Sequence, residues 1–358
     1  MKAWDRVPEP GPGRPDEAAL EELRERGIDL DPAGPGSHRD GHVENGPGGP
    51  TSSDHRHPHA HSEPGEPPVI GIVGAGAVGT ALGLALARAG WPVAAVASRD
   101  AGRRERFRAL VPGARGFAEA TALLDEVELI LLAVPDDALP ALAAELRMYS
   151  GQAMIHTSGA LGAEVLQAAR AAGTQVGGFH PLVAFADTER AVAALHGATV
   201  AIEGDDELTG LLARMAEAIG ATAVRLAPGS KAAYHAAAML SAGGFVALLD
   251  EIAELGRVAG LDEAGALAIY GGLVEQTLGN ARALGIRRAL TGPMIRGDVG
   301  TIRRHLEVLA HEAPDVLPLY RAVAEREVAI AESRGVLTPE AAADIRHAVA
   351  MRDRTGTM

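Results

Sequence analysis

Short apolar runs alternate with helix-like stretches between residues 68 and 227. The runs predict strands at 69–73, 93–97, 128–134, 153–156 and 175–179. Strands that alternate with helices of about ten residues are typical of a parallel sheet with crossover helices. Two further runs, 199–203 and 221–226, flank a helix and would extend the same sheet.

The pattern changes after residue 228. It predicts only helices, at 231–260, 263–284, 301–309, 317–334 and near 339–351. We therefore predict an α/β fold: a Rossmann-like parallel sheet domain over residues 68–227, followed by an all-α substrate and dimerisation domain over residues 228–351. Residues 1–67 are rich in Gly, Pro, acidic residues and His, and cannot bury enough apolar surface to offset their chain entropy. We predict a disordered tail there.

Four histidines alternate along this tail, at His55, His57, His59 and His61. Alternating histidines can bind a transition metal weakly. A solvated polar tract is the stronger interpretation, and we predict no metal site.

Composition narrows the class of protein. The 358 residues are 47% apolar and 22% charged, which is typical of a soluble protein with room for two domains. A net charge of −14 argues against a nucleic-acid partner, which needs a dense basic face. The chain has no cysteine, which excludes disulfides and thiolate chemistry. We expect no signal peptide and no apolar run of membrane-spanning length, and therefore predict a cytoplasmic protein without a membrane partner.

A glycine motif follows the first predicted strand. The sequence G-A-G-A-V-G has the spacing G-x-G-x-x-G and opens a helix, which is the context that dinucleotide binding requires. The first glycine permits a tight turn, the second lets the backbone approach a pyrophosphate, and the third allows the helix to pack closely. The predicted cofactor-binding residues of this motif are Gly74, Ala75, Gly76, Ala77, Val78 and Gly79.

The end of the second strand indicates which cofactor binds. NAD-specific sites place an acidic residue there, whereas this chain has Ser98 and Arg99, with Arg103 and Arg104 one turn further on. An arginine can pair with a 2′-phosphate, and Asp100 is expected to cap the following helix. We therefore predict NADP(H) rather than NAD.

Three loops at predicted strand ends carry further candidates. Val134 and Pro135 end the most apolar strand and could contact the cofactor or only form a turn. Ser158 and Gly159 follow the next strand, and His180 follows the one after. Open α/β sheets bind ligands at this edge, so we predict Ser158 and Gly159 at the substrate and His180 in catalysis.

Lys231 is one of only two lysines among 33 basic residues, and the other, Lys2, lies in the predicted tail. Arginine cannot give up its proton near neutral pH, so a lysine kept among arginines indicates a need for lysine itself. His235 lies one helical turn further on, on the same face. We predict that this pair is catalytic, with the ammonium polarising a substrate carbonyl or supplying its proton. An exposed lysine without a role is the alternative.

Residues 290–298 interrupt the predicted helices with a glycine-rich polar loop. Arg296 is a candidate partner for a substrate carboxylate, together with Asp298. The alternative is that Arg296 and Asp298 pair with each other.

Five motifs, GAGAVG, HTSGA, FHPL, KAAYHAAA and TGPMIRGD, resemble a bacterial family that joins a Rossmann-like domain to a helical domain of undefined function. The resemblance covers residues 68 to about 350 and places the chain in the 6-phosphogluconate dehydrogenase-like group, with ketopantoate, β-hydroxyacid and prephenate dehydrogenases or reductases and pyrroline-carboxylate reductase. Lys231 matches the lysine of a Lys-x-x-x-Asn pair in some of these relatives, but His235 stands in place of the asparagine. The sequence His180-Pro181 is similar to the catalytic His-Pro loop of prephenate dehydrogenases.

The resemblance implies a homodimeric, NADPH-dependent oxidoreductase that reduces a small keto acid, with 2-dehydropantoate of pantothenate biosynthesis as the specific candidate. One alternative is an oxidative dehydrogenase of the prephenate type. The other is a non-catalytic regulator that binds NADP.

Overall fold

The computed structural model describes residues 66–148, 151–171, 173–227 and 229–351. Two compact units make up the chain, one ending at Met239 and the other beginning at Leu240. The sequence analysis placed the boundary at residues 227 and 228, whereas the two units meet within the helix that begins at Lys231. The predicted tail, with its alternating histidines, lies outside the described residues except for Glu66 and Pro67.

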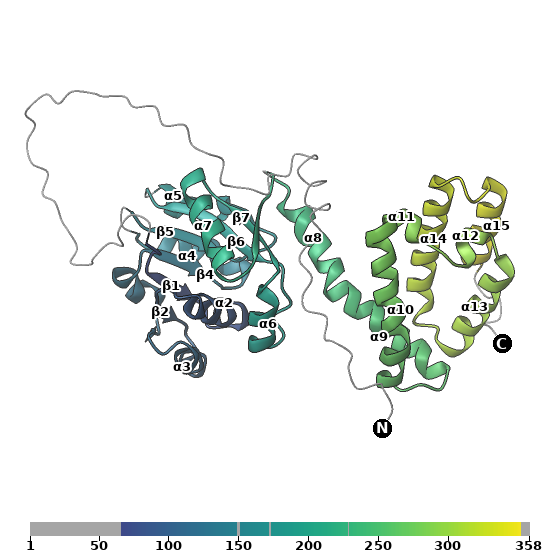
Figure 1. Ribbon diagram of the computed structural model, residues 1–358, viewed down its shortest axis with the longest axis horizontal. Coiled ribbons are helices and arrows are strands. Elements are labelled where there is room, and N and C mark those ends of the chain that lie inside the picture. The colour runs from purple at the N-terminus through teal and green to yellow at the C-terminus, as the bar shows by residue number, and fades with distance from the viewer. Residues whose placement is uncertain (1–65, 149–150, 172, 228, 352–358) are drawn as a thin grey trace, which may run out of the picture. The chain divides into compact units, whose positions relative to one another are not determined.

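An eight-stranded sheet forms the centre of the described part of the first unit (Figure 1). Its strands are β1 (Ile70–Val73), β2 (Val93–Ala97), β3 (Arg115–Phe117), β4 (Leu129–Leu132), β5 (Ala153–His156), β6 (Gln175–Pro181), β7 (Thr199–Glu203) and β8 (Thr222–Arg225). All seven predicted strands are present. The three-residue β3 was not predicted, because Arg-Gly-Phe gives no apolar run.

The strand order is β3-β2-β1-β4-β5-β6-β7-β8. The carboxyl ends of β1 and β4 lie side by side where the order reverses, which is where open α/β sheets bind their ligands. The predicted parallel sheet is confirmed, apart from one antiparallel pair, β6 with β7. That reversal sets Glu203, the last residue of β7, opposite Gly178 in β6, which in turn lies opposite His156.

Helices cover both faces of the sheet (Figure 1). Ile70 and Ile72 of β1 point into one core with residues of α2, α3, α6 and α7, and Val73 belongs to the opposite core with residues of η1 and α4. This alternation follows from the two-residue period of a strand. The elements are α2 (Ala77–Arg88), α3 (Ala101–Leu110), η1 (Ala120–Glu126), η2 (Asp136–Ala138), α4 (Leu139–Glu145), η3 (Ala163–Leu166), α5 (Gln167–Ala171), α6 (Thr188–Leu195) and α7 (Asp206–Ala218).

The second unit is helical throughout its described residues. Its helices are α9 (Gly243–Val258), α10 (Glu263–Leu284), α11 (Ile286–Ala289), α12 (Pro293–Arg296), α13 (Val299–Glu312), α14 (Leu317–Ser333) and α15 (Pro339–Ala350). Met294, Ile302, Val328 and Ile345 are fully or almost fully buried in its main core, which α12 to α15 form. The predicted fold class, a Rossmann-like sheet domain followed by an all-α domain, is confirmed.

One helical run corrects an expectation from the sequence. Residues Lys231–Val258 form α8 (Lys231–Ser241) and α9, broken at Ala242, and have a mean hydropathy of 1.5 over an 18-residue window that is only 6% buried. By length and composition this run could cross a membrane, so the expectation that no run reaches that length was wrong. The many alanines raise the average without forming an obvious block of large apolar residues. One such helix is weak support for a membrane span, since helices in soluble proteins also pass this test.

Candidate functional site

The glycine motif forms a tight turn between β1 and α2. Gly74 has φ +109°, and a Cβ at this position would lie 2.2 Å from the carbonyl oxygen of Ala133. A Cβ at Gly79 would lie 2.0 Å from the carbonyl oxygen of Gly74. A Cβ at Gly76 would meet no atom within 4 Å, so the space above this residue is free for a ligand. The turn therefore has the backbone shape and the open face that a pyrophosphate needs.

A cavity of about 610 Å³ lies against this turn. Nine of the ten predicted cofactor-binding residues line it; the tenth, Gly79, packs beneath the turn. The cavity continues along the ends of β2 to β5 and over α4, where Glu119, Leu142 and Thr157 line it. Its size and place at the switch point of the sheet fit a dinucleotide.

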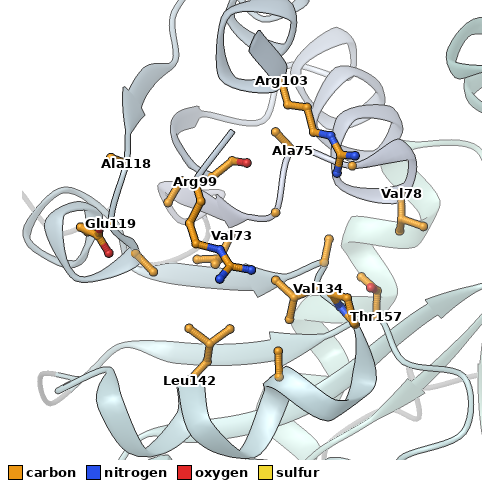
Figure 2. A pocket seen from close by; sticks show the side chains of 18 of the residues that line it. Val73, Ala75, Val78, Arg99, Arg103, Ala118, Glu119, Val134, Leu142 and Thr157 are labelled. Carbon is orange, nitrogen blue, oxygen red and sulfur yellow. The ribbon is translucent and has the colours of Figure 1, made fainter. Parts of the chain in front are cut away.

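Two arginines enter this cavity. Figure 2 shows the side chains of Arg99, just after β2, and Arg103, on α3, extending into the hollow. The carboxylate of Asp100 accepts a hydrogen bond from the backbone N–H of Arg103 at 2.9 Å, which confirms it as the cap of α3. The side chain of Arg104 points elsewhere and donates to the carbonyl oxygen of Ser98. The end of β2 thus offers two guanidinium groups where an NAD site has a carboxylate.

The hydroxyl of Ser158, in the loop after β5, is already engaged within the chain. Its Oγ donates to Oδ2 of Asp136 at 2.9 Å and accepts from the backbone N–H groups of Ala160 and Leu161 at 3.2 and 3.0 Å. Ser158 therefore shapes its loop and ties it to the end of β4. Its predicted contact with substrate stays a prediction.

Gly159 packs against both predicted histidines. A Cβ at this residue would lie 2.4 Å from Cδ2 of His235 and 2.6 Å from Nε2 of His180. The two imidazole rings meet edge to face, with centroids 5.8 Å apart, and Nδ1 of His180 lies 3.4 Å from the hydroxyl of Tyr234. The first turns of α8 and the ends of β5 and β6 thus bring His180, His235 and Gly159 together.

Lys231 is buried, with only 4% of its surface exposed, which excludes the alternative of an exposed lysine. Its Nζ lies 3.6 Å from Oε2 of Glu203, and within the described residues it has no partner at hydrogen-bond distance. Burial lowers the pKa of Lys231, and Glu203, Glu164 and Asp136 partly oppose that shift. The ammonium therefore gives up its proton more readily than an exposed lysine would.

Two histidines near this lysine are neutral. Burial, reinforced by the charge of Lys231, lowers the pKa of His156 to about 4 and that of His180 to about 4. His156 is fully buried at the carboxyl end of β5, and its Nε2 is 3.2 Å from the carbonyl oxygen of Gly162. His180 is only partly buried, so it is the histidine of the two that solvent or a ligand can reach.

Arg296 and Asp298 lie in the second unit. Asp298 caps α13: its carboxylate accepts from the backbone N–H of Thr301 at 3.0 Å and from the hydroxyl of the same residue at 2.7 Å. Arg296 is exposed at the end of α12. Although its charge contributes to a lowered pKa of Asp298, the carboxylate has Thr301 as its hydrogen-bond partner. A role for either residue toward substrate stays a prediction.

Three residues of this arrangement were missed from the sequence. Glu203 lies at the end of an ordinary apolar strand, and its importance follows from the antiparallel pairing of β7. Asp136 directly follows Val134 and Pro135 and was not itself chosen as a candidate. Tyr234 lies between the two predicted α8 residues, and its spacing of three from Lys231 was the one signal that could have revealed it. Among the described residues, no group of three or more His, Asp or Glu side chains is arranged to hold a metal ion.

Comparisons with known proteins agree with this geometry. Residues 57–181 match a family described as a Rossmann-like domain, and residues 198–327 match the domain of unknown function DUF2520. No curated protein sequence matches the chain.

Several solved structures share the fold. A Bacteroides fragilis protein, provisionally described as an NADP oxidoreductase, is 22% identical to this chain, with a TM-score of 0.62. The match covers 73% of this chain and 98% of that one. A Thermotoga maritima protein is 24% identical, with a TM-score of 0.56 and coverages of 75% and 100%. The 1-pyrroline-5-carboxylate reductase of Streptococcus pyogenes is 17% identical, with a TM-score of 0.52 and coverages of 74% and 98%.

Proposed function

We propose that this chain, which joins a Rossmann-like domain to a DUF2520 domain as its motifs predict, is an NADPH-dependent oxidoreductase that reduces the carbonyl group of a small keto acid. The observation that carries the proposal is a buried lysine with unused hydrogen-bond donors, set beside His156. The next residue along the chain, Thr157, lines the dinucleotide cavity. We further propose a cytoplasmic location.

In this proposal, bound NADPH supplies a hydride. The turn at Gly74 and Gly76 holds the pyrophosphate, and Arg99 and Arg103 pair with the 2′-phosphate. Lys231 donates a hydrogen bond to the carbonyl oxygen of the substrate and then gives its proton to that oxygen. Its lowered pKa supports this role, because a proton donor works best when its pKa lies near the working pH.

The specific substrate we propose is 2-dehydropantoate, which rests on the resemblance of the motifs alone. The test is a screen of NADPH oxidation by the full-length protein against a panel of keto acids and cyclic imines, with ketopantoate included. Turnover of a keto acid would support the proposal. NADPH binding without turnover of any compound would contradict it and favour the regulator alternative.

A second candidate is an oxidative dehydrogenase of the prephenate type. The neutral state of His180 favours it, because a neutral imidazole at pH 7 accepts the proton that a hydroxyl loses on oxidation. The two candidates differ in the residue on which they depend. In the oxidative case His180→Asn abolishes NADP reduction and Lys231→Met does not.

We expect the double variant Arg99→Ala/Arg103→Ala to bind NADPH about 10²- to 10⁴-fold more weakly and NADH with unchanged affinity. The reason is that charge-assisted hydrogen bonds to the 2′-phosphate are lost, each contributing about 1.5–3 kcal/mol. Fluorescence titration with both cofactors measures the change. The control is Arg106→Ala, which removes the same charge from α3 at an exposed position that does not line the cavity. An unchanged ratio of the two affinities in the double variant would contradict the assignment of NADP.

We also propose a homodimer. Large apolar side chains are exposed along the second unit, with exposed fractions from 51% to 79% at Leu240, Val246, Ile269, Leu273, Leu278, Leu284 and Ile286. In α10 only Ala266 is buried, and a helix with apolar residues exposed on this scale marks an interaction site. Light scattering at micromolar concentration should give twice the mass of the chain. A monomer that sediments with lipid vesicles would instead favour the membrane.

A further inference from the structure

Three neighbouring strands present residues in one row at the edge of the sheet. His156 of β5 lies opposite Gly178 of β6, which lies opposite Glu203 of β7. Residues paired across strands in this way point to the same face of the sheet. The middle position has no side chain, and the ammonium of Lys231 fills the space. A Cβ at Gly178 would lie 3.0 Å from Nζ of Lys231 and 3.4 Å from Oε2 of Glu203.

Glu203 connects two further parts of the site. Its Oε2 accepts a hydrogen bond from the backbone N–H of Ala163 at 3.0 Å and forms the ion pair with Lys231 at 3.6 Å. Ala163 closes the loop that carries Ser158 and Gly159, and Lys231 begins α8. One carboxylate oxygen therefore fixes the loop after β5 and the start of α8 to the same point of the sheet.

From this geometry we infer that Glu203 is the positioning residue of the site: it holds the ammonium of Lys231 in the gap above Gly178 and keeps it charged. Without a carboxylate there, an ammonium that is 95% buried would face only neutral neighbours on β5 and β6. The other acidic groups that act on it are Asp136 after β4 and Glu164 in η3, both of which are exposed. Solvent screens exposed charges, so Glu203 is the carboxylate that decides the charge state of Lys231.

This inference rests on the proposed function for its catalytic meaning, but it can be tested without any substrate. The chain contains two lysines, so a protein labelled with [13Cε]lysine gives two signals, and Lys2→Arg assigns them. We expect Glu203→Gln to move the titration of Lys231 to lower pH by about 1–3 units, because an opposite charge nearby favours the charged form. The amide keeps an oxygen that can accept from Ala163, so the variant removes the charge and preserves the hydrogen bond.

In an activity assay, the alkaline limb of the pH profile of kcat/KM should move to lower pH by the same amount in Glu203→Gln, since the proton donor must be protonated. KM for NADPH should stay unchanged, because Glu203 does not line the cavity. Glu203→Asp keeps the charge on a shorter side chain. Its pH profile should therefore be shifted less from that of the wild type than the profile of Glu203→Gln. The matched control is Glu217→Gln on the exposed face of α7, which should change neither the titration nor the profile.

The outcomes separate the two proposals. If the wild-type protein reduces no compound of the panel, the proposed function fails, and the titration of Lys231 still tests its pairing with Glu203. If the wild-type protein is active and Glu203→Gln alters neither the titration nor the pH profile, the inference about Glu203 is overturned and the proposed function stands. Should Glu203→Gln not fold, the Glu203→Asp titration decides.

Discussion

Lys231→Met is expected to lower kcat for keto acid reduction by about 10²- to 10⁴-fold, the usual contribution of a general acid. Methionine fills a similar volume but has neither a donor nor a proton to give. Because Lys231 does not line the cavity, NADPH affinity should not change. Steady-state NADPH oxidation measures the first effect, and fluorescence titration of NADPH measures the second.

The chain supplies a matched control in Lys2→Met, the same substitution at its one other lysine. That variant should behave as the wild type does. The substitution at residue 231 also leaves Glu203 without its cation, so the thermal unfolding midpoint should be measured and the assay run well below it. A folded Lys231→Met protein with wild-type kcat would contradict the role of Lys231 as proton donor.

Local chemistry was enough to predict the dinucleotide cavity. The glycines of the turn and the Ser-Arg pair after the second strand act on a ligand through their own backbone and charges, within one β-α-β unit. Sequence spacing therefore translated almost directly into the lining of the cavity, from Gly74 to Arg99. Residues that line the cavity from other segments, such as Glu119 before η1 and Leu142 in α4, gave no such local signal.

The surroundings of Lys231 could not be predicted in this way. The lone lysine was visible by composition, but its partner Glu203 lies 28 positions earlier, and their contact depends on the direction of β7. No pattern in a short apolar strand tells whether it runs parallel or antiparallel to its neighbour. Gly178 gave no signal in the sequence for the same reason: the need for a residue without a side chain appears only when β7 and Lys231 are placed beside it.

The apolar surface of the second unit shows a different limit. The alanine-rich run Lys231–Val258 has no long block of large apolar residues, yet its average hydropathy is high enough for a membrane span. Burial of such a helix depends on what packs against it, which the residues of the helix do not specify. The proposed dimer and the membrane alternative are therefore questions for measurement of mass and vesicle binding.

Gly159→Ala is expected to reduce kcat by at least about 100-fold in either direction of reaction, comparable to loss of a positioned acid–base group. The added methyl group would lie 2.4 Å from the ring of His235 and 2.6 Å from that of His180, distances that no relaxed packing permits. Both rings must move, or the loop after β5 must move away from them. In either case the arrangement of α8 against the sheet edge is lost, and displacements of about 1 Å can cost a factor near 100.

The cavity should survive this change, because the turn at Gly74 and the arginines after β2 are built from other segments. We therefore expect NADPH affinity to be unchanged while turnover falls. Gly210→Ala is the matched control: a Cβ there meets no atom within 4 Å, and alanine is favoured over glycine inside α7. Unaltered kcat in Gly159→Ala would mean that the histidine pair lies outside the catalytic arrangement, whereas equal loss of NADPH binding would mean that the substitution damages the fold of the whole unit.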